Sequence, residues 1–233
     1  MNVKDRLAEV QERIDAACHR AGRDPSEVTL VAVSKRHPVA SIAEAYAAGA
    51  RVFGENYVQE WQAKAEDPAL LRLPEVRWSF IGHLQRNKVR FLIGRVDLIE
   101  TVDSLRLAKE ISRRAEGRGR GFSQGILLQV NLAAEPGKSG FLVEEIQNAF
   151  EELAGLPGVD VQGLMHIPSP RPDASSTRAD HAGLRTLRDE LRSASGLDLR
   201  ELSMGMSSDF EAAIEEGATR VRVGTALFGP RQP

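Results

Sequence analysis

Lys35 is the residue of this sequence with the sharpest chemical implication. It stands at the end of TLVAVSK, directly after an apolar run of the kind that forms a buried strand. A lysine amine attacks a carbonyl only in its neutral form, and a desolvated or electropositive setting at an inward strand end favours that form. A solvated lysine at a strand edge is the competing interpretation, and the other segments decide between the two.

Two later segments have the composition of an anion site. SMGMSSDFEAAI predicts a glycine-containing loop that leads into a helix, with Ser207 or Ser208 as the N-cap and Asp209 in the first turn. RVRVGTALFG predicts a strand followed by Gly224, which permits close approach to the backbone, and Thr225, which offers a hydroxyl and an N–H. Free N–H groups at such positions bind phosphate, whereas simple capping is the alternative for the first segment.

Three further polar residues accompany these segments. Arg222 lies inward if strand alternation places it there, as a partner for a phosphate or a ring nitrogen; otherwise it forms an outer salt bridge. Asn56, after a second apolar run, fits either a contact to a ligand oxygen or a cap, and His83 follows a third run. Their common position after strand-like runs indicates one functional face.

Other motifs carry weaker signals. Gly117, Gly119 and Gly121 precede a strand-like run, whereas a dinucleotide fingerprint follows one. The five histidines show no zinc-like pairing with a cysteine or with one another, and no nucleophile elbow supports a Ser-His-Asp triad. We therefore expect neither a nucleotide cofactor, nor a metal site, nor hydrolase chemistry.

The elements that must position these residues alternate between strand-like and helix-like segments, which predicts an α/β protein with a parallel sheet. The eight predicted strands cover 28–34, 51–54, 76–81, 96–101, 125–131, 159–166, 199–204 and 219–223. The predicted helices cover 39–48, 56–65, 84–91, 104–114, 142–153, 179–194 and 209–216, and an amphipathic helix precedes the first strand.

Eight strands in 233 residues predict a single (β/α)8 TIM barrel over residues 1–233 with an extra N-terminal helix. A doubly wound open sheet is the alternative. The irregular stretches 117–121 and 167–173 are short enough to be loops within one domain. In a barrel the strand ends converge on one face, and the loops after strands seven and eight often bind phosphate.

Composition excludes several classes of protein. A hydrophobic fraction of 42% and a charged fraction of 27% are those of an ordinary globular protein, and no apolar run approaches the length of a membrane span. The charged N-terminus lacks a signal core, so we expect a cytoplasmic protein without a membrane partner. The net charge of −2 gives no field that attracts nucleic acid. Cys18, the single cysteine, lies on the apolar face of the first helix and is expected to pack.

From the N-terminal helix to the last residues, the sequence resembles the YggS/PROSC family of pyridoxal phosphate homeostasis proteins. The segments that carry the resemblance are LVAVSK, VFGENYVQE, FIGHLQRNK, QVNLAAEPGKSG, GLMHI, LSMGMSSDFEAAIEEGAT and VRVGTALFG, in the family's order. The resemblance implies an alanine-racemase-like barrel of fold type III. It also implies that pyridoxal 5′-phosphate (PLP) is held as an imine on Lys35.

Carried over by motif, Ser207, Gly224 and Thr225 would hold the phosphate. Arg222 would face the pyridine nitrogen, and Asn56 would lie near the oxygen substituent of the ring. An arginine keeps its proton, so the ring nitrogen would stay unprotonated and the cofactor would be a weaker electron sink.

The sequence departs from the family pattern at two positions. Ser79 stands where histidine is usual, and His166 stands where a small residue is common. These departures concern details of the pocket rim and not the cofactor, and His83, on the same face, is assigned no role.

The resemblance implies a reversible PLP carrier in intracellular PLP homeostasis, with apo PLP-dependent enzymes as partners. Related racemases use a second base, a tyrosine from an added β-domain of a partner subunit. This chain has only Tyr46 and Tyr57 and no room for such a domain, so we expect a monomer without efficient catalysis. The alternatives are a PLP-dependent enzyme such as a weak amino-acid racemase, and a cofactor-free Schiff-base aldolase on a phosphate-binding barrel.

Overall fold

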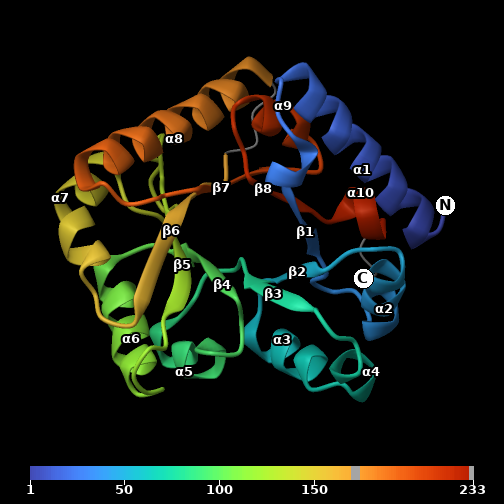
Figure 1. Cartoon of the computed structure of the whole chain (residues 1–233), viewed down its shortest axis with the longest axis horizontal. Coiled ribbons are helices and arrows are strands. Elements are labelled where there is room, and N and C mark those ends of the chain that lie inside the picture. The colour runs from blue at the N-terminus through green and yellow to red at the C-terminus, as the bar shows by residue number, and fades with distance from the viewer. Residues whose placement is uncertain (169–173, 231–233) are drawn as a thin grey trace.

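Eight parallel strands close into a barrel in the computed structural model, which describes residues 1–168 and 174–230 (Figure 1). Each strand pairs with its neighbour in sequence, and β8 pairs with β1 to complete the ring. The strands are β1 (Thr29–Val33), β2 (Val52–Glu55), β3 (Arg77–Phe80), β4 (Leu98–Val102), β5 (Gln124–Gln129), β6 (Val159–Met165), β7 (Glu201–Met206) and β8 (Arg220–Val223). The predicted barrel is confirmed, and the open sheet is excluded.

Helices surround the barrel as an outer ring (Figure 1). They are α1 (Val3–Arg20), α2 (Val39–Ala47), α3 (Val58–Ala65), α4 (Pro68–Leu71), α5 (Val89–Leu92), α6 (Leu105–Glu116), α7 (Val143–Ala154), α8 (Ala174–Ser195), α9 (Phe210–Glu215) and α10 (Thr225–Phe228), with 3₁₀ turns η1 (Pro25–Glu27) and η2 (Arg86–Lys88). Among the described residues, no helix is both long and apolar enough to cross a bilayer.

The strands are buried on both sides, which explains their continuous apolar runs. Every residue of β5 is buried. Ile126 and Leu128 belong to the large hydrophobic cluster that includes the helices, whereas Leu127 clusters separately with Leu98 and Met165. Because side chains alternate along a strand, the small cluster lies inside the barrel and the large one lies between barrel and helices.

The N-terminal helix α1 covers the barrel beside α9 and α10 (Figure 1). Its apolar face, including Cys18, is buried, which confirms the packing role predicted for that cysteine. Two ion pairs join α1 to α9: Arg13 Nε lies 2.8 Å from Glu211 Oε1, and Arg20 Nε lies 2.8 Å from Glu215 Oε1. Helix α1 therefore packs against α9 and α10, the helices that follow the last two strands of the barrel.

The helix prediction was wrong at several boundaries. The predicted helix 84–91 is instead η2 followed by the short α5, which ends just before Gly94, a residue with a positive φ of 69°. The short helices α4 and α10 were not predicted, although Asp67 caps α4 by accepting a hydrogen bond from Ala69 N at 2.8 Å. Helix α8 begins at Ala174, and residues 169–173 of the predicted loop 167–173 lie outside the described residues.

Candidate functional site

A cavity of ≈250 Å³ opens at the carboxyl ends of β1, β7 and β8. Its lining comprises Val33, Lys35, Asn56, Ile81, Ile167, Met206, Ser207, Ser208, Arg222, Gly224 and Thr225. All six residues predicted to bind a ligand are in this set, although they come from four separate segments of the chain. Their convergence follows from the parallel barrel, which brings strand ends together on one face.

The two loops predicted to bind phosphate are joined through Ser207. Its Oγ accepts hydrogen bonds from Gly224 N at 3.3 Å and from Ala226 N at 3.4 Å. A Cβ added at Gly224 would lie 3.4 Å from Val33 Cβ, an ordinary contact, so the protein's own packing does not demand glycine there. Gly205 differs, because its φ is +90° and an added Cβ would lie 2.6 Å from Ala213 Cβ. Glycine at 205 lets α9 pack directly against the end of β7.

The predicted N-cap of α9 was wrong. The helix begins at Phe210, and Asp209 occupies the cap position instead of Ser207 or Ser208. Ser207 is engaged with the loop after β8, as described above, and Asp209 Oδ1 accepts a hydrogen bond from Met206 N at 2.7 Å. Asp209 therefore closes the turn at residues 206–209, and this turn places Ser207 at the cavity.

The residues on either side of Lys35 are held by a buried ionic cluster. Lys64 Nζ donates to Ser34 O at 2.8 Å, and it lies 2.7 Å from both Glu55 Oε1 and Glu60 Oε1. Arg36 N donates to the same Glu60 oxygen, and Arg36 has a positive φ of 61°. These contacts fix the backbone before and after the lysine, so they determine where its side chain starts.

Glu55 is the anion at the centre of this cluster. Ser34 Oγ donates to its Oε1 at 2.7 Å, whereas its Oε2 is buried without a hydrogen-bond partner in the described part of the chain. Burial raises the pKa of Glu55, and the Lys64 ammonium and the Ser34 hydroxyl oppose that rise. A carboxylate in this position depends on its cation.

Sequence reasoning did not identify Lys64 or Glu60. A signal was present, because the two residues are four apart in α3, the spacing of a helical ion pair. Lys64 also lies on the buried side of α3 with Val58 and Trp61. A lysine on an apolar helix face indicates a buried partner.

Arg222 is buried and lies inward, as one of its two predicted orientations requires. Its Nη1 donates to Ser203 Oγ at 2.7 Å, and its Nη2 donates to His166 O at 2.8 Å. Burial lowers the pKa of Arg222, and the carboxylates of Glu100 and Asp209 oppose this effect. The guanidinium is thus fixed by two acceptors at the floor of the cavity.

Below Arg222 lies a polar layer inside the barrel. Ser203 Oγ donates to Glu100 Oε2 at 2.6 Å, and Arg220 Nε lies 3.1 Å from Glu100 Oε1. Arg220 Nη2 also donates to Ser79 Oγ at 2.9 Å. Ser79 is buried in the barrel interior and not at the pocket rim, and its short side chain leaves room for Arg220.

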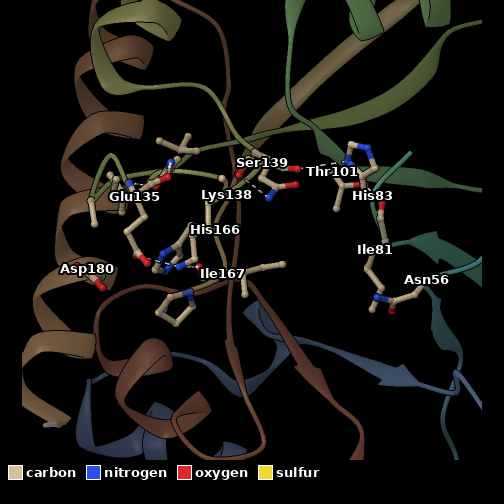
Figure 2. A pocket seen from close by; sticks show the side chains of 18 residues that line it. Asn56, Ile81, His83, Thr101, Glu135, Lys138, Ser139, His166, Ile167 and Asp180 are labelled. Carbon is tan, nitrogen blue, oxygen red and sulfur yellow. Dashed lines mark hydrogen bonds and ion pairs between the residues drawn. The ribbon is translucent and has the colours of Figure 1, made fainter. Parts of the chain in front are cut away.

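A second cavity of ≈330 Å³ adjoins the first and shares Asn56, Ile81 and Ile167 with it. Figure 2 shows His83 on one side of this cavity and Lys138 and His166 on the other. His83 is exposed, with Nδ1 3.2 Å from Asp103 Oδ2. It therefore lies at the rim of the second cavity and outside the lining of the first.

Asn56 lies where the two cavities meet, and it supplies an unused acceptor. Its Oδ1 is buried and has no hydrogen-bond partner among residues 1–168 and 174–230. A buried carbonyl oxygen of this kind is normally satisfied, so a ligand donor would remove an energetic penalty here. The cavity thus combines an amine, a guanidinium, two hydroxyl-bearing loops and an open acceptor.

The comparisons with known proteins agree with this arrangement. The family model described as "Alanine racemase, N-terminal domain" matches residues 6–232. A pyridoxal phosphate homeostasis protein of Aquifex aeolicus is 45% identical over 232 residues, covering 100% of both chains. One of Homo sapiens is 41% identical over 234 residues, covering 97% of this chain and 85% of the human protein.

A solved structure is similar to this chain over nearly its whole length. PipY of Synechococcus elongatus, in a structure with PLP bound, superposes with a TM-score of 0.86 at 42% identity, covering 98% of this chain and 100% of that chain. The resemblance noted from the motifs is confirmed by these matches. The chain belongs to the alanine racemase N-terminal domain family, and within it to the pyridoxal phosphate homeostasis proteins.

Proposed function

We propose that this protein binds PLP reversibly as an imine on Lys35 and acts in PLP homeostasis, supplying the cofactor to other enzymes without efficient catalysis of its own. The observation that carries the proposal is that Lys35, Arg222 and the loops of Ser207 and Thr225 line the same cavity. Full-length similarity to PLP homeostasis proteins and to a PLP-bound structure supports it.

The groups that line the cavity suit each part of PLP. Hydroxyls and backbone N–H groups around Ser207, Gly224 and Thr225 suit the phosphate. The unsatisfied Oδ1 of Asn56 can accept a hydrogen bond from a ligand. When bound, PLP supplies an aldehyde that condenses with amines and a ring that withdraws electrons. Lys35, held by its anchored neighbours, would present the amine.

Arg222 would limit how strongly the ring withdraws electrons. Its guanidinium is fixed by Ser203 and His166, and it keeps its proton at physiological pH. A ring nitrogen that accepts a hydrogen bond from such a group stays unprotonated. The bound cofactor would then stabilise a carbanion less well than one that faces a carboxylate.

The two tyrosines do not supply a second base at the cavity. Tyr46 donates its hydroxyl to Pro74 O at 2.6 Å, and Tyr57 is half exposed. Neither belongs to the described lining of the cavity. Racemisation needs a base on each face of the substrate carbon, so this arrangement supports a carrier over a racemase.

A PLP-dependent enzyme of low activity is the second candidate function. The observation that favours it is the second cavity, which adjoins the Lys35 cavity and has the volume of a small-ligand site. An amino acid in that cavity could reach the cofactor, and the outcome would depend on whether the chain then moves a proton.

In the proposed role, the recipients of PLP are apo forms of PLP-dependent enzymes in the cytoplasm. The carrier would act as a monomer, with residues 1–233 forming one barrel domain. Release would require an amine or water to reach Lys35 through the cavity that it lines.

Two assays separate the candidate functions. The PLP-loaded protein is incubated with an apo PLP-dependent enzyme, and the recovered activity of that enzyme is measured against free PLP at equal concentration. The same protein is incubated with a panel of amino acids under multiple-turnover conditions. We expect transfer of PLP without turnover. Turnover of an amino acid would instead support the enzyme. The absence of both transfer and turnover would refute both functions.

A further inference from the structure

Two buried histidines from different elements contact each other beside the cofactor cavity. His166 follows β6 and His181 lies in α8, and their exposed fractions are 2% and 0%. His166 Nε2 lies 2.8 Å from His181 Nδ1, and His181 Nε2 lies 3.2 Å from Asp209 Oδ2. This pairing was not predicted from the sequence, because the two positions are brought together only by the packing of α8 on the barrel.

The direction of the last hydrogen bond in this chain of contacts follows from its carboxylate end. Although burial acts to raise the pKa of Asp209, hydrogen bonds from His181 and from Met206 N outweigh it and leave that pKa below its ordinary value. Asp209 is thus an anion that only accepts, so His181 Nε2 donates to it. His181 Nδ1 and His166 Nε2 share the next hydrogen bond of the chain. Burial, reinforced by His181, Arg222 and Lys138, lowers the pKa of His166 well below its ordinary value, which keeps its ring neutral.

Both ends of this chain reach groups that would bind the cofactor. At one end, the carbonyl oxygen of His166 accepts from Arg222 Nη2 at 2.8 Å. At the other, Asp209 Oδ1 accepts from Met206 N at 2.7 Å, and Asp209 N donates to Met206 O at 3.1 Å. The turn at residues 206–209 is thereby closed on both sides, and it carries Ser207. The histidine pair therefore connects the floor of the cavity to its phosphate loop.

Packing alone does not account for this arrangement. Burying polar rings is unfavourable unless they are hydrogen-bonded, and two apolar side chains of similar size would fill the same space without that requirement. Each ring has a hydrogen-bond partner, because His166 contacts His181 and His181 contacts the carboxylate of Asp209. The hydrogen bond from His181 fixes the position of the Asp209 carboxylate, and this carboxylate closes the turn at residues 206–209.

We propose that His166 and His181 are positioning residues for PLP binding, which hold the phosphate-binding turn 206–209 in a fixed relation to Arg222. The inference rests on the proposed function, because it assigns the phosphate to that turn. It predicts that loss of the pair weakens binding of the phosphate group selectively. A residue needed only for packing would affect ligands with and without a phosphate equally.

The test compares PLP with pyridoxal, which carries a hydroxyl in place of the phosphate. Dissociation constants of both are measured on the apo protein by titrating the visible absorption of the lysine adduct. The variants are His181→Leu, which removes the bridge, and His181→Gln, whose amide retains one donor and one acceptor. His19→Leu is the matched control, since it makes the same change at an exposed site on α1. Circular dichroism establishes that each variant is folded.

We expect His181→Leu to raise the Kd for PLP about tenfold while the Kd for pyridoxal changes less than about twofold. His181→Gln should restore PLP binding to within about threefold of the wild type, and His19→Leu should match the wild type. Equal weakening of both ligands, or no change in either, overturns the inference while leaving the proposed function intact. A wild-type protein that forms no adduct overturns the proposed function and this inference with it.

Should His181→Leu fail to fold, His166→Leu gives the same comparison, since it removes the bond to His181 but keeps the backbone carbonyl that Arg222 uses. The expected increase in the ratio of the two dissociation constants is then smaller, about threefold, because the bond from His181 to Asp209 is retained. An unchanged ratio in a folded His166→Leu protein also overturns the inference.

Discussion

Two turns border the cofactor cavity, and different interactions hold them: a buried ion cluster holds one, and a pair of histidines holds the other. The turn that carries Lys35 is anchored by the buried Lys64 ammonium between Glu55 and Glu60. The turn at residues 206–209 is anchored by a pair of hydrogen-bonded histidines that ends on one carboxylate. In both turns the functional residue lines the cavity, while the anchor holds its backbone neighbours.

The two anchors differ in which buried group is left without a partner when each anchor is removed. Removing the cation from a buried ion cluster leaves an uncompensated charge, which is among the most destabilising single changes. Removing the histidine bridge leaves a carboxylate with a backbone partner still in place. We therefore expect the Lys35 side to determine folding stability and the phosphate side to determine selectivity.

Lys64→Met should have the largest effect on stability. It leaves Glu55 buried without its cation, and we expect the free energy of unfolding to fall by about 3–5 kcal/mol in urea titrations. Lys109→Met is the matched control, because its partner Glu152 is also exposed and such pairs contribute less than about 1 kcal/mol. Equal losses in the two variants would refute the ionic anchor.

His181→Leu should destabilise the fold less, by about 1–3 kcal/mol, because it removes hydrogen bonds without stranding an unpaired cation or anion. The measurement is the same urea titration, so the two anchors are compared on one scale. A loss larger than that of Lys64→Met would reverse the proposed division between stability and selectivity.

The pH dependence of the Lys64→Met effect should separate the ionic anchor from simple packing. Burial already raises the pKa of Glu55, and loss of Lys64 removes the group that opposes this most strongly. A carboxyl with a raised folded-state pKa favours the folded protein most below its unfolded pKa, and this contribution is lost as pH rises through the folded pKa. The stability difference between wild type and variant should therefore shrink as pH falls from about 8 to about 5. A difference independent of pH would indicate packing alone.

Ser207→Ala should have the smallest effect on stability of the three variants. It removes the acceptor of two long hydrogen bonds from Gly224 N and Ala226 N and one hydroxyl of the phosphate loop. We expect the free energy of unfolding to stay within about 1 kcal/mol of the wild-type value. The Kd for PLP should rise roughly threefold to tenfold, whereas the Kd for pyridoxal should not change. Ser26→Ala, at an exposed site, is the control for the substitution. Unchanged PLP affinity would remove Ser207 from the phosphate site.

The fold was predictable because its signal is local. Each strand is a short apolar run, buried from inside the barrel and from the helices, and all eight appear in the structure near their predicted bounds. The errors fall on short or interrupted helices. Residues 84–91 have a helical pattern, but the segment forms a 3₁₀ turn and a single α-helical turn, which ends before Gly94.

The candidate site was predictable only for residues that stand at, or just after, the carboxyl ends of strands. Lys35, Arg222 and Thr225 could be assigned to one face because a parallel barrel brings strand ends together. The anchors behind them could not, since they depend on contacts between separate elements. The bond from Arg222 to His166 O and the contact of His166 with His181 leave no periodic trace in the sequence.

The central claim, a covalent adduct on Lys35, is tested most directly by borohydride trapping. The wild-type protein is loaded with PLP, reduced with borohydride, digested and analysed by mass spectrometry, with Lys35→Ala treated in parallel. We predict that the wild type loses its yellow colour on reduction and that the pyridoxyl group is found on the peptide containing Lys35, with no trapped adduct in the variant. A wild type that binds no PLP, or a label found on another lysine and retained in Lys35→Ala, would contradict the assignment.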